Sequence, residues 1–148
     1  MFRNKSVNSV CLSVMVMVMT NCGGPNTEHV ADVNPLLWDA GRPALIDIDN
    51  TDTAALYRLD VLLVFNEAFD RESVDFSVTV TAPDSTRLTE QISIPSFCQA
   101  RKLGGNYQLS VPYRDSVKLS APGNYVFGIS PGRDIEGVKS VGINLSKK

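Results

Sequence analysis

The 148-residue sequence contains one histidine, one tryptophan and three cysteines, so the residues that build most metal and nucleophilic sites are scarce. His29 has no second histidine with which to share a metal ion. Two of the cysteines, Cys11 and Cys22, fall at the N-terminus, which leaves Cys98 without a disulfide partner or an activating base. We therefore expect no cofactor, no metal and no catalytic residues, and we interpret Cys98 as a buried structural thiol.

Positive charge is also sparse, since 14 Lys and Arg residues stand against 16 Asp and Glu residues. Arg3 and Lys5 lie near the N-terminus, and without residues 1–21 the net charge falls from −2 to about −4. A phosphate backbone is bound by a basic surface, so we expect no nucleic-acid partner. No pattern identifies a small-molecule substrate either.

The one long hydrophobic run, Val10 to Met19, is too short to cross a bilayer, which takes about 20 residues. It follows Arg3 and Lys5 and is followed by Thr20-Asn21-Cys22, the order of a bacterial lipoprotein signal. We predict a signal peptide over residues 1–21 and a lipid on the thiol of Cys22. An ordinary secretory signal or a buried apolar segment is the alternative.

Residues 22–35 contain glycine, proline and asparagine and show no hydrophobic period. We predict a lipid-anchored tether here, with His29 as a solvated linker residue. The remaining residues, 36–148, are predicted to form a single domain.

Short alternating runs dominate residues 36–148, and no stretch sustains a helical period. Val74, Phe76, Val78 and Val80 alternate with polar residues, and Pro83-Asp84 supplies turn chemistry before the next run. The predicted strands cover residues 44–48, 56–65, 74–82, 88–94, 107–111, 117–119, 125–129 and 138–145. The fold class is all-β: one antiparallel β-sandwich of seven to eight strands, immunoglobulin-like or jelly-roll-like.

Three further patterns have a structural and a functional interpretation. The oxygen-rich segment 47–53 resembles a calcium loop but lacks its glycine and terminal glutamate, so a strand end and polar turn is favoured. Acids such as Glu67, Asp70, Glu72 and Asp75 could form a hydrolytic carboxylate pair, but a solvated loop is the better interpretation. Arg58 is expected to face solvent or to meet Asp60 or Asp47, and Trp38 to close one end of the sandwich.

The order of several motifs resembles the gliding-motility lipoprotein H family of Bacteroidetes. After the predicted lipidation site come Leu37-Trp38, Tyr57-Arg58-Leu59-Asp60-Val61, Pro83-Asp84, Gly105-Asn106-Tyr107, Pro112-Tyr113-Arg114, Pro122-Gly123-Asn124-Tyr125-Val126-Phe127 and a final motif from Ile135 to Ile143. The resemblance covers residues from about Trp38 to Ile143. It implies a periplasm-facing lipoprotein that belongs to a larger envelope assembly.

We therefore expect a non-enzymatic envelope lipoprotein that is held to a membrane, the outer rather than the inner, through lipid on Cys22. Its partners would be other envelope proteins. The alternative is a carbohydrate-binding or surface-glycan module on the same anchor, for which Trp38 and four tyrosines could offer stacking platforms.

Overall fold

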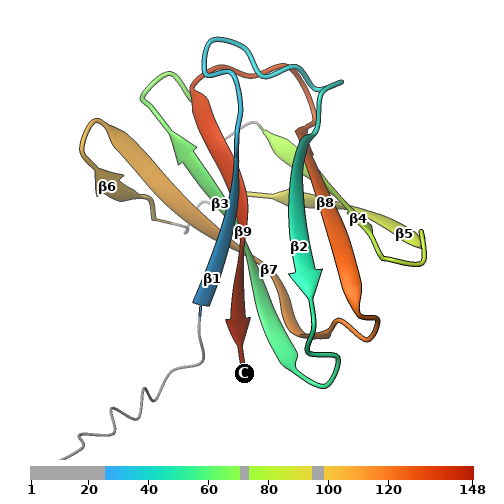
Figure 1. The fold of residues 1–148 in the computed structure, drawn as a ribbon. Helices are drawn as coiled ribbons and strands as arrows, with labels where there is room; N and C mark the ends of the chain where they lie inside the picture. The colour runs from blue at the N-terminus through green and yellow to red at the C-terminus, as the bar shows by residue number, and fades with distance from the viewer. Residues whose placement is uncertain (1–25, 71–73, 95–98) are drawn as a thin grey trace, which may run out of the picture.

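The computed structural model describes residues 26–70, 74–94 and 99–148. Within these ranges the chain forms nine strands and no helix, so it contains no helix that could cross a membrane (Figure 1). The strands are β1 (Asn26–Asp32), β2 (Ala44–Asn50), β3 (Leu56–Phe65), β4 (Asp75–Thr81), β5 (Arg87–Ser93), β6 (Arg101–Leu103), β7 (Asn106–Lys118), β8 (Gly123–Pro131) and β9 (Val138–Lys147). The predicted all-β class is confirmed.

The strands form two antiparallel sheets that pack face to face as a β-sandwich. One sheet has the order β1-β9-β3-β7-β6 and the other the order β2-β8-β4-β5. Apart from the β4–β5 and β6–β7 hairpins, each strand is followed by a strand of the opposite sheet. This is the order of a jelly roll with the short β6 added at one edge, and it decides between the two sandwich types that the sequence allowed.

The core lies between the sheets and is built from the inward side chains of each strand. In β4, Phe76 is fully buried while Asp75 is exposed, which is the alternation predicted for residues 74–82. The central strands of the larger sheet, β3 and β9, contribute Val61 and Ile143, both fully buried. Local alternation therefore selects the face that each strand turns to the core.

Residues 26–32, expected within the tether, instead form β1 at an edge of the five-stranded sheet. All seven residues pair with β9 in unbroken antiparallel register. The tether prediction for residues 22–35 is therefore wrong from residue 26 onward. An edge strand is held mainly by backbone hydrogen bonds, so its polar side chains carry no alternation that a pattern search would detect.

His29 lies in the middle of β1 opposite Ile143 and is half-buried, not a solvated linker residue. The next pair along, Val30 and Gly142, shows how closely β1 lies on β9. A Cβ atom at position 142 would stand 2.5 Å from the carbonyl oxygen of His29. The close approach of the two backbones therefore requires glycine at this position.

β7 runs unbroken from Asn106 to Lys118, where the sequence predicts two separate strands. The register against β3 shifts beside Leu59, and Ser116 has a φ of 60°, so the strand bends here without ending. The exposed polar residues around this bend led to the wrong prediction of a break. β6 was also missed, because it has three residues and all are exposed.

The two ends of the sandwich differ in what they carry (Figure 1). β1 begins where β9 finishes, and we call this the entry end; the connections 51–55 and 119–122 lie there too. The opposite end, which we call the loop end, carries the connections 33–43, 66–70 and 132–137.

Candidate interaction surface at the loop end

The connections at the loop end are joined to one another by backbone hydrogen bonds. The amide of Trp38 donates to the carbonyl of Ile135 at 2.7 Å, and the Ile135 amide donates back at 3.1 Å. The amide of Gly137 donates to the Pro35 carbonyl, and the Asn66 amide donates to the Gly137 carbonyl, both at 2.8 Å. The three connections therefore form one unit.

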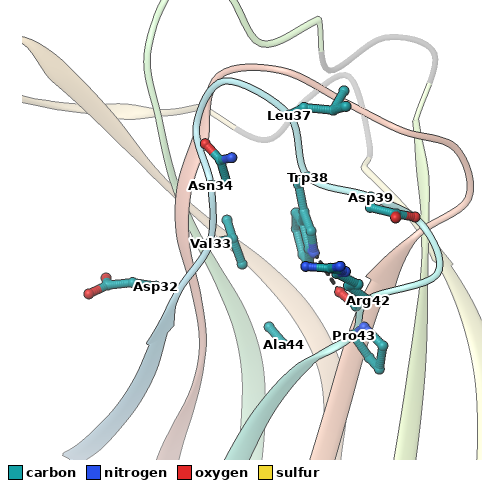
Figure 2. Close-up of a pocket in the computed structure, with 9 residues that line it drawn as sticks. All are labelled: Asp32, Val33, Asn34, Leu37, Trp38, Asp39, Arg42, Pro43 and Ala44. Carbon is teal, nitrogen blue, oxygen red and sulfur yellow. Dashed lines mark hydrogen bonds between the residues drawn. The ribbon is translucent and has the colours of Figure 1, made fainter.

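Trp38 fixes this unit to the core. Its side chain is only 3% exposed, and its ring centroid lies 5.9 Å from that of Phe76. The indole Nε1–H donates to the carbonyl of Arg42 at 2.9 Å, the dashed line in Figure 2. A buried indole with a satisfied N–H is a stable anchor, and it closes one end of the sandwich as the sequence suggested.

Gly137 lets two of the connections touch. It has a φ of 86°, and a Cβ atom built on it would lie 2.4 Å from the backbone nitrogen of Phe69. A side chain here would force the 66–70 connection outward. Phe69 in turn packs on Phe65, with ring centroids 5.0 Å apart. Packing as well as hydrogen bonding thus holds the loop end in one arrangement.

Two leucines project from this unit into solvent. Leu36 is 80% exposed and Leu37 is 50% exposed. Leu37 lines two hollows: one of about 440 Å³ beside Trp38, and one of about 270 Å³ beside Phe69. Figure 2 shows the first, between the end of β1 and the start of β2, with Leu37 at its outer rim. Large exposed apolar side chains on a rigid support are typical of a protein-binding patch.

Carboxylates outnumber guanidinium groups around these two hollows. The acidic lining residues are Asp32, Asp39, Asp70, Asp134 and Glu136, and the basic ones are Arg42 and Arg133. Two of the acids also order the backbone: Asp39 accepts from the Gly41 amide at 2.7 Å, and Asp134 accepts from the Ala40 amide at 2.8 Å. The surface is net negative and complements a partner with basic groups around an apolar side chain.

Two residues singled out from the sequence, Cys22 and Cys98, lie outside the described residues. Lipidation of Cys22 and burial of Cys98 therefore stay predictions.

The oxygen-rich segment 47–53 is the end of a strand followed by a turn, as favoured from the sequence. Asp47 is exposed on β2, where its Oδ1 accepts from the amide of Asn124 at 2.9 Å. Asn50 turns into the core, and its amide donates to two backbone carbonyls at 2.8 and 3.2 Å. The oxygen atoms therefore diverge. In the described ranges no three His, Cys, Asp or Glu residues gather as a metal site would need.

The acids considered as a carboxylate pair have separate surroundings. Asp75 on β4 accepts a hydrogen bond from the Ser93 hydroxyl at 2.6 Å, and Asp70 lines the second hollow of the loop end. Glu67 is exposed, and Glu72 lies outside the described residues.

Arg58 meets one of the two partners that the sequence offered. Its Nε lies 3.1 Å from Oδ1 of Asp60, whose side chain is 10% exposed. The guanidinium of Arg58 stays half exposed on the outer surface of β3, so this pair satisfies a nearly buried carboxylate.

The aromatic side chains of the described residues form no exposed stacking platform. Trp38 and Tyr125 are buried, and Tyr57, Tyr107 and Tyr113 are half-buried against the core. The carbohydrate-binding alternative therefore gains no support from them.

Leu36 was not singled out from the sequence, and Leu37 served only as part of a motif. A signal was present, because Leu36-Leu37-Trp38 is an apolar triplet between Pro35 and Asp39, in a segment too short to be a buried strand. Only the last residue of the triplet, Trp38, forms a bridge, to Ile135, and it turns into the core while both leucines stay outside. Which of them stays outside is decided by the packing of Trp38.

Comparison with known proteins yields no match, either to a family model or to a curated protein.

Proposed function

We propose that this chain is a non-enzymatic lipoprotein of the bacterial cell envelope, anchored through lipid on Cys22, whose loop end binds another envelope protein. We further propose that it is related to the gliding-motility lipoprotein H family, which its sequence resembles. The observation that carries it is the exposed pair Leu36 and Leu37 on a hydrogen-bonded unit lined by carboxylates.

The position of the loop end relative to Cys22 supports the proposal. β1 begins four residues after Cys22, a stretch that spans at most about 14 Å when fully extended. The seven residues of β1 then carry the chain about 20 Å to the loop end. With lipid on Cys22, the entry end lies close to the bilayer and the loop end faces away from it. Its exposed leucines are then out of reach of the lipid and free to meet a protein.

The anchor is tested by Cys22→Ser, with Cys11→Ser as the matched control. Cys22→Ser should release the protein from the membrane fraction, because stable anchoring takes two or more acyl chains and all of them would be attached through this residue. Position 22 precedes the described fold, so the free energy of unfolding should change by less than about 0.5 kcal/mol. Cell fractionation measures the release from the membrane. A Cys22→Ser protein that stays in the membrane pellet with its leader cleaved contradicts the proposal.

The binding surface is tested by Leu37→Asp, with Leu45→Asp as the control. Leu45 is a leucine of similar exposure, 60%, but it lies on the outer face of the four-stranded sheet. Cross-linking in intact envelopes should recover a stoichiometric partner with the wild type and with Leu45→Asp. Leu37→Asp should lower the recovery at least tenfold, as expected for the loss of a central apolar contact.

Salt provides a second measurement of the same contact. Because the hollows are lined by carboxylates, raising the ionic strength should weaken the association. Recovery of the protein alone under mild detergent, or equal loss in both leucine variants, contradicts the proposal.

A further inference from the structure

An apolar hollow of about 340 Å³ lies between the two sheets, on the side where β5 and β7 face each other. Its floor is made by Leu59 and Phe127, both buried, and its mouth by Leu88, which is 55% exposed. Apart from Thr86 and Arg114, the lining side chains are aliphatic or aromatic. Most ligand sites are of this kind: concave, mainly apolar, with a few polar groups at defined places.

The hollow exists because the sandwich is open on this side. β5 is the last strand of its sheet, and β6 covers only the first three residues of β7. Leu88 and Glu90 lie on the inner face of β5, opposite Val80 and Val78 of β4. With no further strand beside β5 in the described residues, Leu88 keeps more than half of its surface in water.

A polar contact joins the two sheets at the rim of this hollow. The Glu90 carboxylate accepts a hydrogen bond from the Tyr113 hydroxyl at 2.8 Å and pairs with the Arg114 guanidinium. The same guanidinium lies 5.6 Å from the centre of the Tyr113 ring. The rim therefore already presents two donors to one carboxylate, directly beside hydrocarbon side chains.

The hollow lies toward the entry end of the sandwich. Leu59 pairs with Arg114 on one side and with Leu145 on the other, and Leu145 pairs with Thr27 at the start of β1. Three strand spacings, about 14 Å, separate Thr27 from Arg114. These paired residues form one row across the sheet. The start of β1 therefore lies at the same level along the strands as the hollow.

We propose that this inter-sheet hollow binds the acyl chain of a free fatty acid, whose carboxylate replaces that of Glu90 at Tyr113 and Arg114. The size agrees, because a methylene group takes about 30 Å³, close to the volume of a water molecule, so the hollow holds about eleven of them. The two donors at the rim select a carboxylate, and the apolar lining selects a hydrocarbon chain. This site is separate from the loop end, so it stands whether or not a protein binds there.

The test uses the full chain in isolated membranes and a dodecanoic acid that carries a photoreactive diazirine at its far end. Cross-links from the far end of the chain should map by mass spectrometry to residues 80–88 and 117–119, which line the hollow away from the carboxylate. Ala82→Phe fills the hollow and should abolish labelling. Thr81→Phe is the matched control: Thr81 is the last residue of β4, directly before Ala82, and it does not line the hollow, so this variant should label like the wild type.

Competition with unlabelled compounds separates specific binding from partition into the bilayer. Each added methylene should strengthen competition about fourfold up to about twelve carbons and then add little, whereas partition continues to rise with length. Dodecanol and dodecyltrimethylammonium should compete less well than dodecanoate. Arg114→Gln should weaken dodecanoate about tenfold and leave dodecanol unchanged.

Equal labelling of Ala82→Phe and Thr81→Phe, or cross-links spread over the chain, overturns the proposal. So does competition that keeps rising beyond fourteen carbons or is indifferent to the head group. Glu90→Gln gives an independent check. The Glu90 carboxylate competes with the ligand for Tyr113 and Arg114, so its removal should strengthen dodecanoate binding severalfold. Unchanged or weaker binding also overturns the proposal.

Discussion

Gly142→Ala should detach β1 from the sheet. The new Cβ atom would lie 2.5 Å from the His29 carbonyl oxygen and 3.1 Å from a methyl group of Val30. The first of these atoms belongs to the backbone, so no side-chain rotation relieves the clash. Either β9 moves, with the core side chains that it carries, or β1 leaves its partner.

The cost is bounded by how firmly β1 is held. β1 pairs with one neighbour only, and most of its side chains are exposed. An edge strand of this kind opens at a lower free energy than the core strands. Since the strand can leave, we expect a loss of about 2 kcal/mol, the usual range for a core that is overfilled by one methyl group.

Two measurements check this prediction. Thermal unfolding should show a melting temperature about 8 °C lower, at roughly 4 °C for each kcal/mol in a domain of this size. Hydrogen exchange should show lost protection for the amides of residues 26–32, while those of β4 stay protected. The measurement therefore reports on β1 separately from global stability.

Gly128→Ala is the matched control. Gly128 is also a buried strand glycine, but a Cβ atom there would lie 3.5 Å from the nearest atom, a methyl group of Leu45. This is ordinary van der Waals contact, so the variant should lose less than about 1 kcal/mol. If the two alanine variants melt alike and β1 keeps its protection in both, then β1 is not held against β9 as described.

Three further results are expected. Trp38→Ala should cost about 3–5 kcal/mol in chemical unfolding, because a buried ring is removed, whereas Trp38→Phe should cost about 1–2 kcal/mol. Asn50→Ala should cost about 2 kcal/mol in the same assay, since it leaves two backbone carbonyls without their donor. Burial raises the pKa of Tyr113 above its ordinary value of 10.0, so the stability that depends on the neutral phenol is complete below pH 10 and is lost as the pH rises through the raised pKa. Titration of tyrosinate absorbance should show a step above pH 10 that Tyr113→Phe removes; an unchanged titration of that variant would contradict the assignment.

The candidate interaction surface was much harder to predict than the fold. Nothing in Leu36-Leu37-Trp38 tells which side chain is buried, because that depends on the Phe76 ring and the Ile135 bridge, about 40 and 100 residues further along. The inter-sheet hollow could not be predicted for the same reason. It is lined by residues from five strands that no local period relates to one another.

The sequence by itself determined which segments become core strands. Where one side of a strand is buried, apolar residues must alternate, and this placed β3 with its observed bounds and β4 and β5 within one residue of theirs. The tertiary structure alone decided that the sandwich is a jelly roll, that β7 continues through its bend, and that residues 26–32 belong to the fold. These features depend on which strands pair, and pairing is made by backbone groups that every residue shares. Alternation in the sequence therefore indicates which face of each strand is buried in the core. Which strands become its neighbours is decided only when all nine strands are assembled.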